Sequence, residues 1–187
     1  PVASVSRDGR VVVERAAERA AVDADLVVVA DGIHSRLRDA LGLRLRRTLL
    51  ADGALRLVVP RVADEMPAGA PDGAAVVESW SGTRRVIYSP CSATDAYLAL
   101  SCLATDAEGR RIPLHVASWR RAFPALGPLF DRIEAHADWE RVTWQRFQVV
   151  RLDRWSAGRV AVLGDAAHAM PPNLGQGAGC ALMNALG

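Results

Sequence analysis

GRVAVLGDAAHAMPPNLGQGAGCALMNALG, residues 158–187, contains a short apolar run, a proline-containing loop and the start of a helix. The apolar run, Val160–Leu163, ends at Gly164 and predicts a strand buried on both faces, as in a parallel sheet. Open α/β sheets bind their ligands beyond the carboxyl ends of the strands. Asp165 is therefore placed to accept hydrogen bonds from a sugar or polyol hydroxyl group.

A glycine cluster follows the proline loop of this stretch. Gly175, Gly177 and Gly179 remove side chains where backbone N–H groups can approach a ligand, and the apolar spacing after them predicts a helix that begins near Gly177. Such a helix start would stabilise an anionic group, such as a pyrophosphate or a reduced flavin ring. The spacing differs from the dinucleotide fingerprint G-x-G-x-x-G, so the glycines alone fit an ordinary strand-to-helix connection equally well.

A second apolar strand with a turn lies near the amino end. DLVVVA, residues 25–30, predicts the strand, and Asp31-Gly32 ends it. Ser35 is placed to cap a short helix that Gly42 would end. Taken locally, these signals also fit a plain strand-to-helix turn.

The two segments resemble motifs of the single-component FAD-dependent aromatic hydroxylases, the family of para-hydroxybenzoate and salicylate hydroxylases. GDAAHAMPPNLGQG, residues 164–177, resembles the second flavin-contact motif of the family. VADGIHSRLR, residues 29–38, resembles the segment that lies near the flavin and the path of the nicotinamide cofactor. The resemblance implies these cofactor-binding residues: Asp31, Gly32, Ser35, Arg38, Gly164, Asp165, His168, Pro172, Gly175, Gln176 and Gly177.

The resemblance implies an FAD-dependent monooxygenase that uses NADH or NADPH and O2 to hydroxylate an aromatic or similar electron-rich small molecule. It implies that Asp165 holds the ribityl chain. Epoxidation, halogenation and isoprenoid reduction on the same fold stay open, although no W-x-W-x-I-P string occurs, which disfavours halogenation. No catalytic residue is predicted. His115 and Tyr88 are candidate general bases, but a structural role is the more usual one for a lone histidine.

The sequence departs from the family at two points. No strand followed by G-x-G-x-x-G occurs near the amino end, where the family uses one to hold the adenosine pyrophosphate. Asn184 stands where the family frequently has an acidic residue. We therefore expect a piece of a longer enzyme, with an inert or weakly FAD-binding remnant as the alternative.

The region between the two segments predicts a different fold class. Alternating apolar residues within 55–102 predict an antiparallel meander, and residues 119–133 predict helices that cover one of its faces. The predicted fold is α/β plus α+β, a partial Rossmann-like FAD-binding domain with an inserted substrate domain. Its predicted divisions are 1–45 and 151–187 for the FAD-binding domain and 46–150 for the substrate domain. Residues 66–73 are expected to form a surface loop.

The amino-acid composition of the chain limits the kinds of partner that we expect it to bind. The net charge is +2 and the basic residues, all arginine, form no run, so we expect no nucleic-acid partner. No apolar stretch approaches the roughly 18 residues of a membrane span and no signal peptide opens the chain, so we expect a cytoplasmic protein without membrane insertion. The three cysteines form no C-x-x-C pair, which predicts buried thiols and no metal site. The five tryptophans are expected in the core.

Overall fold

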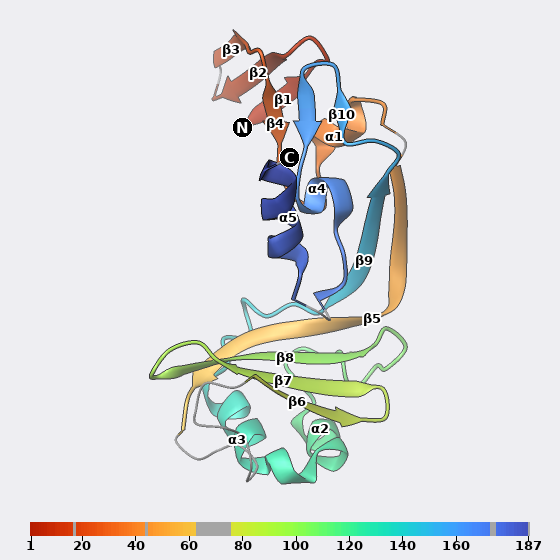
Figure 1. Cartoon of the computed structure of the whole chain (residues 1–187). Helices are drawn as coiled ribbons and strands as arrows, with labels where there is room; N and C mark the ends of the chain where they lie inside the picture. The colour runs from red at the N-terminus through yellow and green to blue at the C-terminus, as the bar shows by residue number, and fades with distance from the viewer. Residues whose placement is uncertain (17, 44, 63–75, 173–174, 187) are drawn as a thin grey trace. The chain divides into compact units, whose positions relative to one another are not determined.

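The computed structural model describes residues 1–16, 18–43, 45–62, 76–172 and 175–186 (Figure 1). The chain divides into two compact units, one of Pro1–Leu49 with Gln148–Gly187 and one of Leu50–Phe147. The divisions expected from the sequence lie a few residues from these bounds, and the roles assigned to the units stay predictions. The expected surface loop, residues 66–73, lies outside the described residues.

The first unit opens with an antiparallel sheet of β1 (Val2–Val5), β2 (Arg10–Arg15) and β3 (Glu18–Asp23). Gly9 turns the chain between β1 and β2 with φ +92°, and a Cβ there would lie 2.1 Å from the carbonyl oxygen of Ala24. The segment ERAAERAA, residues 14–21, has a helix-favouring composition, but Glu14 and Arg15 end β2 and Glu18–Ala21 lie in β3. Eight residues are too few to hold a helix alone, and pairing of β3 with β2 supplies the backbone hydrogen bonds instead.

A parallel strand pair forms the centre of the same unit. β4 (Val27–Val29) pairs in parallel with β11 (Val160–Val162), which also pairs with β10 (Ser156–Ala157). The strand expected there is present, but only one of its faces is fully buried, since Val160 and Val162 are buried and Ala161 between them is partly buried. Three helices accompany these strands: α1 (Arg36–Ala40), α4 (Asp165–His168) and α5 (Gly177–Leu186).

The second unit is built on a five-stranded sheet in the order β6-β7-β8-β5-β9. β5 pairs with β8, β7 with β8, and β6 with β7, all in antiparallel orientation, as the apolar alternation predicted. The strands are β5 (Leu45–Pro60), β6 (Val77–Ser81), β7 (Arg84–Pro90), β8 (Asp95–Leu103) and β9 (Gln145–Leu152).

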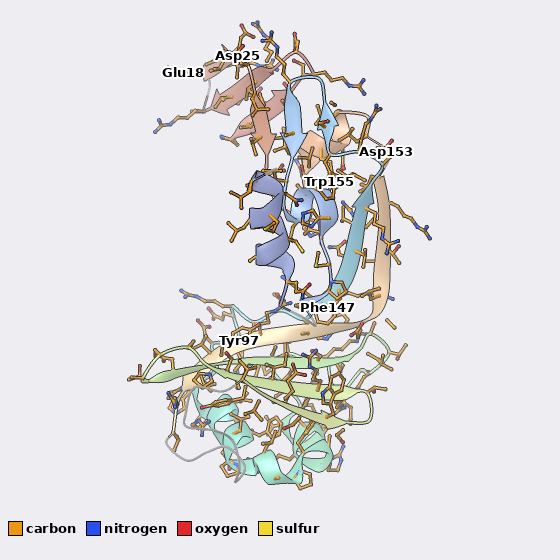
Figure 2. All side chains as sticks on the ribbon, viewed as in Figure 1. Glu18, Asp25, Tyr97, Phe147, Asp153 and Trp155 are labelled. Atoms are coloured by element: carbon orange, nitrogen blue, oxygen red, sulfur yellow. The ribbon has the colours of Figure 1, made fainter. Side chains whose placement is uncertain are left out.

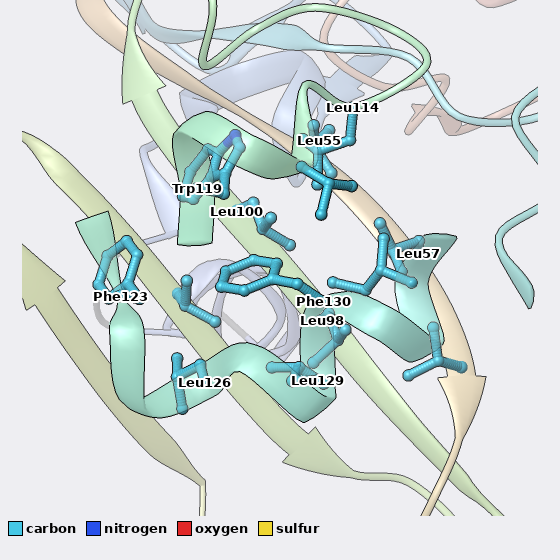
Figure 3. Packing of buried hydrophobic residues seen from close by; sticks show 14 of the residues in the cluster. Leu55, Leu57, Leu98, Leu100, Leu114, Trp119, Phe123, Leu126, Leu129 and Phe130 are labelled. Carbon is cyan, nitrogen blue, oxygen red and sulfur yellow. The ribbon is translucent and has the colours of Figure 1, made fainter. Parts of the chain in front are cut away.

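Helices cover one face of this sheet, as expected. They are α2 (Val116–Ala122), the 3-10 helix η1 (Pro124–Leu126) and α3 (Gly127–His136). Figure 3 shows Trp119 and Phe130 of the helices packed against leucines of the strands, and both aromatic side chains are fully buried. Pro128 does not break α3, because the first turn of a helix tolerates a residue without an N–H group. We call this side of the sheet the helix face and the other the free face.

Arg84 links strand β7 to helix α2 on the helix face through hydrogen bonds. Its Nε donates to Asp106 Oδ2 at 2.7 Å, and its Nη1 donates to Ser118 Oγ at 3.0 Å. Asp106 accepts hydrogen bonds from Arg84 and from the N–H group of Gly109. These bonds, that of Arg84 most of all, hold the pKa of Asp106 below its usual value of 3.8. The Asp106 carboxylate therefore stabilises the fold above that pH, and this contribution is lost as the pH falls through the lowered pKa.

Two expectations about side-chain burial need correction. Trp80 and Trp155 are 64% and 45% exposed, so the five tryptophans do not all lie in the core. Trp80 instead stacks under the guanidinium of Arg85, 5.0 Å from its ring centroid. Cys102 is buried, which raises its pKa to about 11, but Cys91 is exposed and Cys180 is partly buried.

The described residues hold neither a membrane-spanning helix nor a metal-binding group of side chains. None of their helices has the length and apolar character needed to cross a membrane. They also contain no group of three or more histidine, cysteine, aspartate or glutamate side chains that could hold a metal ion.

The two faces of β5 predict different effects of the same substitution. Val59 is 1% exposed on the helix face, and its neighbour Val58 is 54% exposed on the free face. Val59→Ala should lower the free energy of unfolding by about 2 kcal/mol, since it removes two buried methyl groups and leaves a cavity. Val58→Ala should change it by less than about 0.5 kcal/mol. Urea unfolding measures both, and equal losses would contradict the assignment of the faces.

Candidate cofactor-binding site

The two segments singled out in the sequence meet at one edge of the parallel strand pair. Val29 of β4 is aligned with Val162 of β11, so both strands end at the same edge, and the N–H of Leu163 donates to the carbonyl oxygen of Val29 at 2.9 Å. Asp31 follows β4 and Asp165 follows β11, and both residues are exposed. Two carboxylates are therefore available at the edge where such sheets bind ligands.

Arg38 joins the helices that follow these two strands. Its side chain is 0% exposed, and its Nη1 donates at 2.9 Å to the carbonyl oxygen of Ala166 in α4. Ser35 is also buried, and its Oγ accepts the N–H of Arg38 at the start of α1. Direct contact of either side chain with a cofactor would require α1 to move, so we assign both residues a positioning role.

Gly164 turns the chain from β11 directly into α4, a short helix that the sequence analysis missed. Its φ of +58° and ψ of −142° are conformations that residues with a side chain rarely adopt. The carbonyl oxygen of Gly164 accepts the N–H groups of Ala167 and His168, each at 2.9 Å. The acidic residue that follows this glycine, Asp165, was the available signal for a helix start.

The backbone at the start of α5 is not crowded by other atoms. A Cβ at Gly175, Gly177 or Gly179 would meet no atom within 4 Å, so nothing in the described structure crowds these glycines. The N–H of Cys180 donates to the carbonyl oxygen of Gln176 and begins the helical ladder. The N–H groups before it have no partner within the helix, and the helix dipole adds positive potential there.

A cavity of about 640 Å³ lies along one side of α5. Three predicted cofactor-binding residues line it, His168, Gly175 and Gln176, together with Gly179 of the glycine cluster. The sequence analysis gave no binding role to the others: Trp155, Met170, Cys180, Met183 and Asn184. Helical spacing from Gln176 to Asn184 was the signal that could have found the α5 members. The other predicted residues, including Asp31, Asp165 and the exposed Pro172, are not among its lining residues.

His168, which lines the cavity, contacts two other lining residues, Asn184 and Trp155. His168 Nε2 is hydrogen-bonded to Asn184 Oδ1, so the residue that departs from the family pattern is the partner of the motif histidine. The ring centroid of Trp155, which Figure 2 labels, lies 5.3 Å from that of His168. The hydrogen bond joins α4 to the last turn of α5 and orients the imidazole ring.

The two candidate general bases lie away from the free face of the sheet. Tyr88 is 3% exposed and belongs to the hydrophobic cluster on the helix face. His115 precedes α2, and its Nδ1 lies 3.5 Å from Glu108 Oε1. Their positions give both residues structural roles.

Comparison with known proteins identifies the family. Residues 4–186 match the FAD binding domain model. The chain is 48% identical over 165 residues to a putative 2-heptyl-3-hydroxy-4(1H)-quinolone synthase of Rhodococcus erythropolis, which covers 88% of this chain and 42% of that protein. It is 31% identical over 179 residues to 6-hydroxynicotinate 3-monooxygenase of Pseudomonas fluorescens, covering 93% and 46%. The chain therefore belongs to the FAD binding domain family, whose relatives here are FAD-dependent monooxygenases.

A solved structure agrees with this assignment. The tetrameric form of 2-methyl-3-hydroxypyridine-5-carboxylic acid oxygenase superposes with a TM-score of 0.85 at 35% identity, and the match covers 98% of this chain and 48% of that one. The chain spans less than half the length of each of these relatives.

The residues present fit an FAD molecule. The exposed carboxylates of Asp31 and Asp165 can accept hydrogen bonds from its hydroxyl groups, and the N–H groups at the start of α5 can face an anionic part of it. The uncrowded backbone at Gly175 and Gly177 allows close approach of a planar ring.

Asp165→Ala should weaken FAD binding by about tenfold, because it removes a charged acceptor for a cofactor hydroxyl group. Asp25→Ala is the matched control, since Asp25 is an exposed aspartate at the opposite end of β4. Fluorescence titration with FAD measures both dissociation constants. An unchanged affinity in Asp165→Ala would contradict the role of this residue.

Proposed function

We propose that this chain is part of an FAD-dependent monooxygenase that uses NADH or NADPH and O2 to hydroxylate a 2-alkyl-4-quinolone at ring carbon 3. The observation that carries the proposal is the 48% identity to the putative 2-heptyl-3-hydroxy-4(1H)-quinolone synthase of Rhodococcus erythropolis. A second protein of that name, from Mycobacteroides abscessus, is 46% identical over 164 residues. These identities exceed the 31% to the 6-hydroxynicotinate enzyme.

The more distant relatives support a broader substrate class. Two of them are named for 6-hydroxynicotinate and 2-methyl-3-hydroxypyridine-5-carboxylic acid, and a Klebsiella pneumoniae relative, 28% identical, was solved with FAD and uric acid. Each of these compounds is a nitrogen heterocycle that carries an oxygen atom on its ring. An oxygen-bearing nitrogen heteroaromatic compound is therefore the substrate class that we propose, and the 4-quinolone is its particular member.

The proposed reaction replaces a C–H bond by a C–OH bond. One oxygen atom of O2 enters the product and the other leaves as water, while NAD(P)H and a proton together supply two electrons and two protons. FAD supplies the electron transfer from the nicotinamide and the activation of O2. No step requires a metal ion in this balance.

The protein residues position and shield the reacting groups. Asp165 and Asp31 would accept hydrogen bonds from the cofactor's hydroxyl groups at the edge of the parallel strands. The start of α5 would stabilise negative charge on the reduced cofactor through its free N–H groups and dipole. Arg38 would hold the two edge segments together from the interior.

An inert or weakly FAD-binding chain is the alternative class, and other chemistry on the same fold is the alternative reaction. A flavin-dependent brominase superposes with a TM-score of 0.76, but at 14% identity this likeness shows the fold alone. Product analysis separates the alternatives.

Incubation of the FAD-loaded protein with 2-heptyl-4(1H)-quinolone, NADH or NADPH and O2 should yield the 3-hydroxy product. With ¹⁸O2 the product should gain one labelled oxygen atom, as measured by mass spectrometry. 6-Hydroxynicotinate is the matched substrate control. NAD(P)H oxidation that yields only hydrogen peroxide with the quinolone would contradict the proposed substrate, and failure to bind FAD would support the inert alternative.

A further inference from the structure

His168 and Asn184 join two helices of the first unit through their side chains. His168 ends α4, and Asn184 lies in the last turn of α5. The imidazole Nε2 is hydrogen-bonded to the amide oxygen Oδ1, and this is the only side-chain hydrogen bond of α5 among the described residues. An amide oxygen can only accept a hydrogen bond, so Nε2 carries a proton and donates. The bond therefore selects a form of His168 that has a proton on Nε2.

The His168 end of this bond is anchored to the strands. Its ring centroid lies 5.3 Å from that of Trp155, and the carbonyl oxygen of Trp155 accepts the N–H of Val162 in β11 at 2.8 Å. The next residue is held as well, since the carbonyl oxygen of Ala169 accepts the N–H of Val150 in β9 at 2.9 Å. His168 is therefore a fixed point to which a neighbouring helix can be attached.

Helix α5 has few other contacts that could keep it in position. None of its residues is buried, and Leu182, Met183 and Leu186 are exposed. A Cβ at Gly164 would lie 3.5 Å from the Cβ of Ala181, so the helix packs there against a residue without a side chain. Contacts between such small residues bury little apolar surface and stabilise the packing only weakly. The hydrogen bond in the last turn of α5 therefore contributes much of the attachment of this helix.

The same bond closes a segment that contains predicted flavin contacts. Pro172, Gly175, Gln176 and Gly177 all lie between the two bonded residues in the sequence. A link between the ends of a segment reduces the number of conformations that the segment can adopt. Binding of a ligand to a segment that is already ordered costs less conformational entropy, which strengthens the affinity.

We propose that Asn184 is a positioning residue for FAD, which holds the start of α5 and the loop before it in their binding arrangement through its bond to His168. The inference rests on the candidate FAD site and on the proposed function. It adds a role for His168 as the donor to Asn184. It also explains how an amide can stand where the family frequently has an acid, because both side chains offer the acceptor oxygen that the bond needs.

The test compares two substitutions of Asn184. Asn184→Leu keeps the approximate size of the side chain and removes the acceptor oxygen, whereas Asn184→Asp keeps an oxygen at that place. Fluorescence titration with FAD measures the dissociation constants. We expect Asn184→Leu to weaken FAD binding about tenfold and Asn184→Asp to change it less than about threefold. Leu182→Ala changes an exposed residue of the same helix, and this control should bind FAD as the unchanged protein does.

Nitrogen-15 NMR of the histidine rings gives a readout that a change of stability alone would not move. The chain has four histidines, and the spectrum of His168→Gln identifies the signals of His168. The ring should carry a proton on Nε2 in the unchanged protein and in Asn184→Asp, and it should exchange between the Nε2 and Nδ1 forms in Asn184→Leu. A neutral His168 ring with its proton on Nδ1 in the unchanged protein would overturn the inference.

Urea unfolding separates a positioning role from a merely structural one. If Asn184→Leu lowers the free energy of unfolding while the folded variant keeps its FAD affinity, the inference is overturned. Equal weakening of FAD binding by Asn184→Leu and Asn184→Asp would also overturn it, since the acceptor oxygen would then have no effect.

The inference and the proposed function fail in different ways. A protein that binds FAD but does not hydroxylate the quinolone contradicts the proposed function alone, and the titrations still decide the role of Asn184. If the unchanged protein does not bind FAD, amide hydrogen exchange tests the positioning by itself. Asn184→Leu should then speed exchange of the amides of residues 175–180 about tenfold, and Asn184→Asp should not. Equal exchange in all three proteins would overturn the role of Asn184.

Discussion

The parallel pairing of β4 with β11 is the constraint on which the candidate cofactor site depends. It brings together the residues after Val29 and those after Val162, although more than a hundred residues separate them in the sequence. The buried guanidinium of Arg38 then holds α1 to α4 through the carbonyl oxygen of Ala166. A charge without solvent contact is stable there because its N–H groups are used by carbonyl oxygens and by Asp39. Removing that cation would leave those acceptors unpaired at the base of the site.

The second unit is built differently, around an antiparallel sheet. One face is closed by α2 and α3 around Trp119, so it provides stability and no access for a ligand. The other face carries Arg56, Val58, Tyr97 and Ala99, which pair across β5 and β8.

Much of this arrangement could be predicted from the sequence. The apolar run at Val160, the glycine before Asp165 and the helix start at Gly177 are local signals, and the structure places strand and helix there. Residues 18–21 form a strand despite their helix-favouring composition, because pairing with β2 outweighs local propensity. The exposure of Trp80 and Trp155 could not be predicted either, since apolar character does not reveal which face of a sheet or loop a side chain occupies.

The contacts of the candidate site residues could also be predicted only in part from the sequence. Arg38 and Ser35 are part of a recognisable motif, but their buried hydrogen bonds are visible only in three dimensions. Asn184 was marked as a departure from the family, and its bond to His168 depends on how α5 packs against α4.

We propose that residues 29–38 and residues 164–177 form one FAD site and that Arg38 holds them together. The most direct measurement is a fluorescence titration of FAD into the protein and into Arg38→Met, with Arg36→Met, an exposed arginine of the same helix, as the control. We expect Arg38→Met to weaken FAD binding at least tenfold, although the side chain has no exposed surface with which to touch a ligand, and Arg36→Met to bind FAD normally. A folded Arg38→Met protein with unchanged FAD affinity would contradict it.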